Sequence, residues 1–168
     1  MIVLGIDPGL ANTGYGVVAR RAGRLEALDG GVIETSAELA FERRISIVHE
    51  RVRAILSEHD CAAMALEELY FGANVRTAFA VGHARGVCML AAGERGVPCF
   101  SYTPQRVKSA VCGNGRAQKD QVARMVKTLL ALHDEPAADH ASDALAVAIC
   151  HCNAAPLNRA LELAGAKR

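Results

Sequence analysis

Acidic residues stand at several points of the sequence where a strand or a helix should begin or end. Asp7 follows the apolar run 1–6, Glu67 closes the apolar segment 62–67, and Asp143 opens the apolar stretch DALAVAIC. Ionised carboxylates are rarely buried without a partner. If the strands that end at Asp7 and Glu67 are parallel neighbours, both carboxylates reach the same carboxyl edge of the sheet, where open α/β sheets bind ligands.

Such a gathering of carboxylates predicts a binding site for divalent metal ions. Carboxylates brought close together repel one another unless a cation neutralises them. Hard ions such as Mg²⁺ or Mn²⁺, bound through oxygen ligands, are the expected solution. Two ions about 4 Å apart would serve the in-line attack of water on a phosphodiester, because one activates the nucleophile and the other stabilises the leaving oxygen.

Each residue of this set also has a plainer interpretation. The D-P-G sequence at Asp7 is usually only a turn, and Glu67 has a second acid beside it that could be an ordinary surface charge. His140 and Asp139 precede Asp143 by three and four residues, which puts them on one helical face. Asp139 could simply cap the helix, and His140 could be a surface histidine. A metal site is favoured because several such residues occur together at the ends of strands and helices, beside a basic segment.

The charge is strongly segregated along the chain although its total is only +1. Residues 1–70 have a net charge of −4, residues 71–130 carry nine Lys and Arg against two acids, and residues 131–168 have a net charge of −2. The basic middle segment indicates a polyanionic partner. A solvated helical face is the alternative explanation of the same charges.

Composition places the chain among soluble globular proteins of one domain. It has 168 residues, of which 51% are hydrophobic, and it lacks both an apolar run of about 20 residues and a secretory signal. Its six cysteines include no C-x-x-C pair, which favours reduced thiols and a cytoplasmic location without a membrane. The triplet Cys150-His151-Cys152 resembles a metal site, but adjacent helical residues point in different directions.

The elements that must position the acidic residues begin with three strands and continue with alternating helices and strands. Strands are predicted at about 2–6, 15–19, 25–33, 62–67 and 97–102, and helices at about 41–56, 75–92, 104–112, 122–130 and 139–152. This order predicts an α/β fold with a mixed sheet and helices on both faces. Residues 1–168 form a single predicted domain, whose last ~15 residues could be a disordered tail.

Several motifs resemble the RuvC family of bacterial Holliday-junction resolvases, in the same order and over residues 2–153. The matching segments are IDPG (6–9), TGYG (13–16), LE (66–67), GHARG (82–86), YTPQRVK (102–108), GNG (113–115), KDQV (119–122) and DALA (143–146). The resemblance implies a ribonuclease H-like fold with a five-stranded mixed sheet whose first three strands are antiparallel. It also implies a homodimer that resolves four-way DNA junctions by paired, symmetric cuts in recombination and repair.

The same resemblance implies roles for the acidic set. Asp7, Glu67, His140 and Asp143 match the family's catalytic metal ligands, two Mg²⁺ or Mn²⁺ ions per active site. Asp7 would bridge the ions, Glu67 would hold one, and His140 with Asp143 would hold the other. Many members carry Asp where His140 stands, so a nitrogen ligand here makes Mn²⁺ more plausible relative to Mg²⁺. Asp139 lies one residue from the matching position and stays outside the set.

Contacts to DNA are expected from the basic segment and one aromatic residue. By resemblance, Lys108 and Lys119 lie near the scissile phosphate, where they would hold the backbone and stabilise charge. About half of six further basic residues should contact phosphates, with Arg76 and Arg116 among them. The six are Arg76, Arg85, Arg106, Arg116, Arg124 and Lys127. Tyr70 matches a family aromatic that stacks on an unpaired base, although it could equally plug the edge of the core.

A dimer is expected from the chemistry of a four-way junction. Two symmetry-related cuts are needed and one acidic cluster offers one, so a two-fold homodimer is the simple solution. Ala78, Gly82 and Gly86 recur at every fourth position and would let a second helix approach closely; in the family this helix forms the dimer interface. Close packing within one chain is the alternative. The family also suggests the RuvA–RuvB branch-migration complex as a partner.

Three other functions are consistent with parts of the sequence. A ribosomal-RNA-processing nuclease of the ribonuclease H-like type would share the early Asp and the Gly-rich turn, but would lack the basic segment with Lys108 and Lys119. A sugar-kinase or actin-like ATP site needs a duplicated domain that 168 residues cannot hold. A junction protein that only binds DNA would not need the full acidic set.

Overall fold

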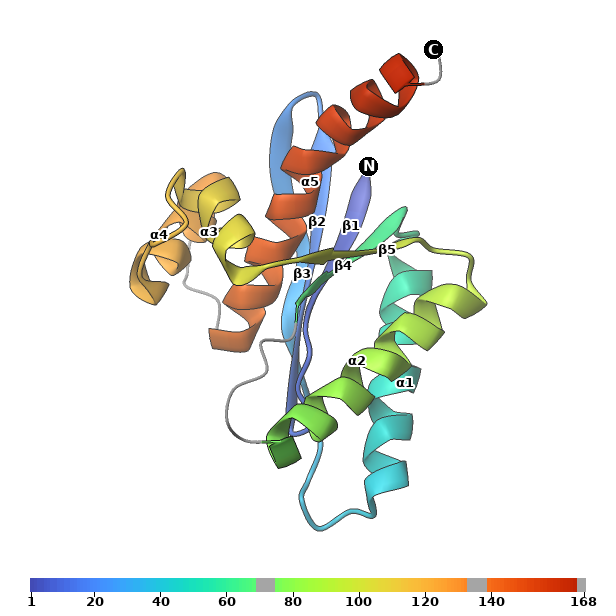
Figure 1. Cartoon of the computed structure of the whole chain (residues 1–168). Coiled ribbons are helices and arrows are strands. Elements are labelled where there is room, and N and C mark those ends of the chain that lie inside the picture. Colours follow the sequence, from blue (N-terminus) through green and yellow to red (C-terminus); the bar gives the residue numbers. More distant parts are fainter. Residues whose placement is uncertain (69–74, 133–138, 166–168) are drawn as a thin grey trace.

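Five strands form one mixed sheet in the order β3-β2-β1-β4-β5 (Figure 1). Their bounds are β1 Ile2–Asp7, β2 Asn12–Arg21, β3 Arg24–Glu34, β4 Ala63–Glu67 and β5 Cys99–Tyr102. The first three strands pair antiparallel, and β1, β4 and β5 pair parallel. The predicted sheet is therefore confirmed. This computed structural model describes the backbone of residues 1–68, 75–132 and 139–165, and the side chains of residues 1–68, 78–132 and 139–155.

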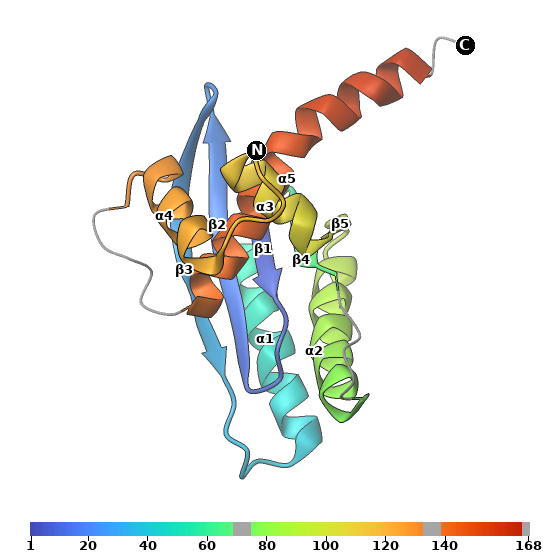
Figure 2. The ribbon, with the colours of Figure 1, turned by 60° about the vertical axis from the view of Figure 1, so that its left-hand side comes forward.

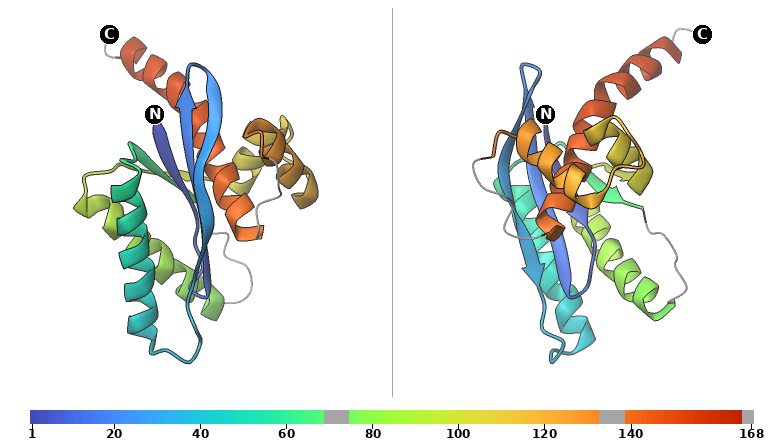
Figure 3. Two further views of the ribbon diagram at one scale, coloured as in Figure 1. Left: turned by 180° about the vertical axis from the view of Figure 1, so that it is seen from behind. Right: turned by 90° about the vertical axis from the view of Figure 1, so that its left-hand side faces the viewer.

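Helices cover both faces of the sheet, as the element order predicted. Helices α1 (Phe41–Glu58) and α2 (Val75–Glu94) lie on one face, and α3 (Pro104–Cys112), α4 (Lys119–Leu129) and α5 (Asp139–Gly165) lie on the other (Figures 1 and 3). In the part of the chain that is described, no helix is long and apolar enough to cross a membrane.

Strand β1 shows how the alternation of side chains builds two cores. Leu4 and Ile6 are fully buried in the core under α1 and α2, whereas Val3 is fully buried in the core under α3, α4 and α5. Successive side chains of a strand point to opposite faces. Asp7 consequently belongs to the α5 face, and Glu67 belongs there too because its β4 neighbours Met64 and Leu66 lie in the opposite core.

Glycines allow α5 to lie directly on the sheet. A Cβ added to Gly5 would overlap the backbone oxygen of Ala144, and one added to Gly14 would overlap the backbone oxygen of His140. Glycine is the residue that permits such close approach of backbone to backbone. Since Gly14 pairs with Asp7 across the strands, this packing brings the start of α5 over the end of β1.

Helix ends agree with the sequence signals at α3 but not at α5. Thr103 caps α3 by accepting a hydrogen bond from the Arg106 amide, and Gly113 ends the helix with a positive φ of 72°. Helix α5, predicted to end near Cys152, continues to Gly165 and extends past the sheet (Figure 2). The added stretch 153–165 is rich in Ala and Leu, which favour helix.

Candidate active site

The acidic residues of β1 and β4 lie side by side at the carboxyl edge of the sheet. Gly5 pairs with Ala65 and Ile6 pairs with Leu66 in the parallel register, so one step further along both strands come Asp7 and Glu67. Both belong to the face that α5 covers. Three parts of the chain therefore bring the four predicted ligands to one place: the ends of β1 and β4, and the first turns of α5.

Asp7 is held by a contact with His140 and is followed by a turn that a separate hydrogen bond closes. Nδ1 of His140 donates a hydrogen bond to Oδ2 of Asp7 across 2.7 Å. The Asp7 side chain is only 19% exposed, while that of His140 is 45% exposed. The turn that follows Asp7 is closed by the buried Thr13, whose hydroxyl donates to the Gly9 carbonyl. Thr13 belongs to the TGYG motif, but its role in fixing this turn was not predicted from the sequence.

Asp143 is held by a lysine at the start of α4. Lys119 Nζ lies 3.2 Å from Oδ2 of Asp143 and 3.3 Å from Oδ2 of Asp139. Burial alone would lower the pKa of Lys119, but the hydrogen bonds and charges of the two aspartates outweigh it, and the pKa is raised. Burial raises the pKa of Asp143 even though Lys119 opposes the shift. The predicted DNA-binding lysine thus contacts the acidic set directly.

Glu67 carries the clearest electrostatic sign of a cation site. Burial raises its pKa to about 7, and the charges of Asp7 and Asp143 add to the rise, which Lys108 and Lys119 oppose. Burial and the two neighbouring acids together therefore disfavour the ionised form of this carboxylate. A divalent cation would favour its ionised form.

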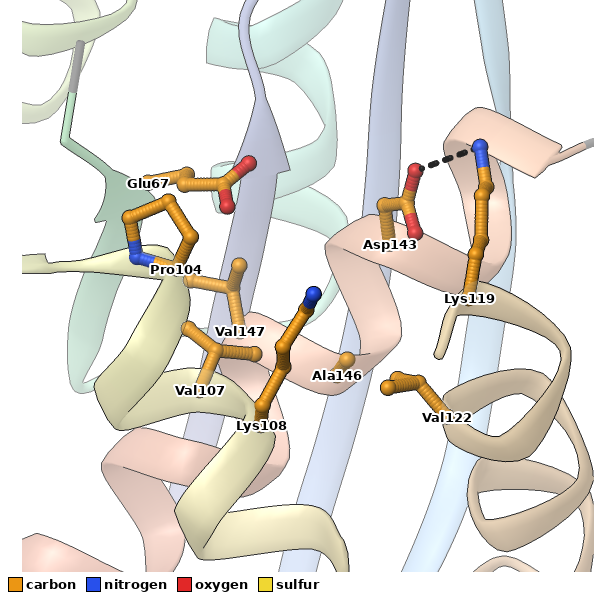
Figure 4. Close-up of a pocket in the computed structure, with 9 residues that line it drawn as sticks. All are labelled: Glu67, Pro104, Val107, Lys108, Lys119, Val122, Asp143, Ala146 and Val147. Carbon is orange, nitrogen blue, oxygen red and sulfur yellow. Dashed lines mark ion pairs between the residues drawn. The ribbon is translucent and has the colours of Figure 1, made fainter. Parts of the chain in front are cut away.

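A cavity of about 270 Å³ connects the acidic and basic side chains. Val107, Val122, Ala146 and Val147 give it an apolar lining, and Glu67, Asp143, Lys108 and Lys119 give it its charges (Figure 4). The Lys108 ammonium points toward the space between Glu67 and Asp143, and Lys119 reaches Asp143 from the opposite side (Figure 4). Opposite charges facing one small cavity suit a site where a metal ion and a phosphate meet.

The donor set fits hard divalent ions by its chemistry. Three carboxylates and one imidazole are an oxygen-rich set suited to Mg²⁺ or Mn²⁺. Among the described side chains, no three or more His, Cys, Asp or Glu form a group already placed to hold a metal ion. His140 instead contacts Asp7, and Lys119 contacts Asp143. A bound ion would compete with these two partners for the same carboxylates.

The structure describes only some of the other predicted site residues. Arg116 is exposed on the segment that leads into α4. Tyr70 lies outside the described residues, as does the side chain of Arg76. Among the atoms that the structure describes, a Cβ added to Gly82 or Gly86 would meet nothing within 4 Å, so these two glycines are not required for close packing against that part of the chain.

The side chains of Cys150, His151 and Cys152 do not point to a common metal site. His151 is buried and its Nδ1 lies 2.7 Å from the Tyr102 hydroxyl, whereas Cys150 Sγ contacts the Arg106 carbonyl at 3.8 Å. Burial lowers the pKa of His151. The three adjacent side chains therefore serve the packing of α5 against β5 and α3.

Comparisons with known proteins agree with this geometry. A family model described as Crossover junction endodeoxyribonuclease RuvC matches residues 3–151. The chain is 48% identical to the protein of that name from Moorella thermoacetica, over 98% of this chain and 99% of the relative, and 47% identical to that from Alkaliphilus oremlandii, over 91% and 93%. The solved structure of Thermus thermophilus RuvC in complex with Holliday junction substrate is 40% identical, with a TM-score of 0.90, over 94% of this chain and 96% of that chain.

Proposed function

Because this chain belongs to the crossover junction endodeoxyribonuclease RuvC family, we propose that it cuts four-way DNA junctions at the cluster of Asp7, Glu67, His140 and Asp143. Membership makes it an endodeoxyribonuclease of DNA recombination and repair. The observation that supports the catalytic assignment is that three separate parts of the chain bring these four side chains together: Glu67 and Asp143 line the charged cavity, and His140 contacts Asp7.

The acidic set would hold two Mg²⁺ or Mn²⁺ ions. Bound there, the ions would supply an activated water and neutralise the leaving oxygen of a phosphodiester. Asp7 and Glu67 present their carboxylates from adjacent strand ends. His140 and Asp143 lie three residues apart on α5, so their side chains share one face of the helix. The imidazole of His140 makes Mn²⁺ a suitable ion.

The lysines of α3 and α4 would hold the DNA backbone. Lys108 and Lys119 line the same cavity as Glu67 and Asp143, so a phosphate at the metal site lies within reach of both. Lys119 is 60% exposed and can exchange its contact with Asp143 for one with a phosphate. Arg116 is exposed on the same side of the sheet and extends the basic surface; Arg76 and Tyr70 remain expected contacts.

Two copies of the chain would act together. The outer face of α2 is open at Gly82 and Gly86, and it exposes Phe79, Met89 and Leu90, of which Phe79 is 66% exposed. Apolar side chains beside glycines on the exposed face of a helix suit the two-fold packing of a homodimer. We place this dimer in the cytoplasm, with the RuvA–RuvB complex as its expected partner in junction processing.

The direct test is a cleavage assay on a synthetic four-way junction. We expect two symmetric cuts with Mg²⁺ or Mn²⁺, none without a divalent ion, and little cutting of a linear duplex or of RNA. Equal cutting of the linear duplex would contradict junction selectivity. Tight junction binding without any cut, under all metal conditions, would indicate a binding-only protein instead.

A further inference from the structure

An arginine on α2 contacts the backbone of the proposed ligand Glu67 from the opposite side of the sheet. Arg85 Nη1 donates to the Glu67 carbonyl across 2.6 Å, and its Nη2 donates to the Ser101 hydroxyl across 2.5 Å. Glu67 ends β4, and Ser101 belongs to the neighbouring β5. One planar guanidinium therefore joins the ends of two strands.

The end of β4 is paired on one side only: Glu67 is in register with Tyr102 of β5, whereas the pairing of β4 with β1 ends at Leu66. Glu67 is the last residue of its strand, and the next amide, that of Glu68, donates to the Tyr102 carbonyl across 2.8 Å. Strand ends fray when their backbone groups lack partners. A hydrogen bond from a charged donor to the Glu67 carbonyl consequently fixes the peptide that carries the metal-ligand side chain.

Arg85 is itself well positioned to act as an anchor. Its neighbours Ala84 and Cys88 on α2 are fully buried, and Cys88 belongs to the core under α1 and α2, so the helix cannot shift without disturbing the core. The guanidinium has a rigid fork of donors, and binding at two points removes most of its freedom. Its contacts with the strand ends are therefore fixed by the packing of α2.

We propose that Arg85 is a positioning residue for catalysis: it holds the end of β4 so that the Glu67 carboxylate stays in place to bind metal. This inference rests on the proposed function of Glu67. It also changes the expected role of Arg85, which the basic segment had suggested only as one of several candidate phosphate contacts. A group that orients a ligand typically contributes about 10–100-fold to metal affinity or activity.

The test compares Arg85→Leu, Arg85→Lys and Ser101→Ala with the wild-type protein. For Arg85→Leu we expect a cleavage rate about tenfold lower and a Mn²⁺ concentration for half-maximal cleavage about tenfold higher. The affinity for the junction should stay within about threefold, because Arg85 does not hold DNA in this proposal. Arg85→Lys and Ser101→Ala should fall between Arg85→Leu and the wild type, since each keeps one part of the bridge.

Two measurements separate positioning from a general loss of stability. Calorimetric titration of the junction-free protein with Mn²⁺ should show weaker binding for Arg85→Leu, and hydrogen exchange should be faster at the Glu68 amide while the amides of α1 keep their protection. Arg53→Leu is the matched control, because Arg53 is an exposed arginine of α1; it should match the wild type in every assay.

Two results would overturn the proposal. One is an Arg85→Leu protein with wild-type Mn²⁺ binding and a wild-type cleavage rate. The other is a junction affinity that falls as steeply as the rate while Mn²⁺ binding is unchanged, since this would make Arg85 a DNA contact. Failure of the proposed function looks different: in that case Glu67→Gln would cut junctions as fast as the wild type.

Discussion

Helix α5 carries two histidines that make similar hydrogen bonds in opposite surroundings. His140, in the first turn, contacts Asp7 at 2.7 Å and is 45% exposed. His151, further along, contacts Tyr102 at 2.7 Å and is 3% exposed. Burial lowers the pKa of His151 and keeps it neutral as a structural partner, whereas His140 is open to a cation or a substrate.

The difference shows that position along the helix decides the role of the residue. The first turn of α5 lies at the carboxyl edge of the sheet, where acids from two strands gather and a cavity opens. The later turns lie inside the core, where His151 is also stacked against Phe100 with ring centres 4.4 Å apart. In the sequence, the cysteines around His151 also resembled a metal site, but the different directions of adjacent helical residues argued against it.

The largest effect is expected from Asp143→Asn. Loss of this carboxylate should reduce the junction cleavage rate about a thousandfold or more, equivalent to about 4 kcal/mol of transition-state stabilisation, while junction binding changes little. The measurement is single-turnover cleavage at saturating protein. Asp120→Asn is the control, since Asp120 is an exposed acid of α4 paired with Arg124. Cleavage by Asp143→Asn at a near-wild-type rate would remove it from the site.

Substitution of His140 should reduce catalysis rather than stability. We expect His140→Ala to lower the cleavage rate about 10–100-fold, with a free energy of unfolding within about 0.5 kcal/mol of the wild type because the side chain is near the surface. His140→Asp should restore cleavage and shift the metal preference toward Mg²⁺. A His140→Ala protein with full activity would make its contact with Asp7 incidental.

Substitution of His151 should have the opposite result. His151→Leu leaves the buried Tyr102 hydroxyl without its partner, so we expect the free energy of unfolding to fall by about 1–3 kcal/mol. The cleavage rate per folded molecule should not change. Adding Tyr102→Phe should recover part of the loss, because both polar groups are then gone. The free energy of unfolding is measured by urea titration. If the cleavage rate per folded molecule also falls, His151 has a role in the site.

A further expected effect concerns the pH dependence of stability without metal. The pKa of Glu67 is raised from 4.5 to about 7, so the folded state holds this proton more tightly than the unfolded state does. Its contribution to stability therefore decreases as pH rises from about 4.5 to 7. Glu67→Gln should become more stable than the wild type over this range and keep that advantage above it. Parallel curves for the two proteins would contradict the raised pKa.

Much of this arrangement could be predicted from residue order and type. The β-β-β-α-β pattern and the apolar runs predicted a mixed sheet. The acids that end β1 and β4 were predicted to meet if these strands are parallel neighbours, and they are. The signals for α3, Thr103 with Gly113, were local and therefore reliable. The length of α5 was not predicted: the chain after Cys152 contains Pro156, a residue that usually ends or kinks a helix, yet α5 continues to Gly165.

Contacts between distant elements could not be predicted in the same way. Nothing near Lys119 in the sequence indicates that it reaches Asp143 and Asp139, and the Arg85 bridge joins residues of three elements. Such contacts depend on how α2 and α4 pack, which periodicity alone does not specify. The closeness of His140 to Asp7 depends on Gly14, whose meaning appears only when α5 lies across it.

The most direct test of the metal site is anomalous diffraction from crystals of the protein soaked in Mn²⁺. We expect an ion within about 2–2.5 Å of the Asp7 carboxylate, with Asp143 and His140 or Glu67 among its other ligands, and none at Cys150-His151-Cys152. Ions at saturating Mn²⁺ that avoid Asp7, or that gather at His151 instead, would contradict the assignment of Asp7, Glu67, His140 and Asp143 as the metal ligands.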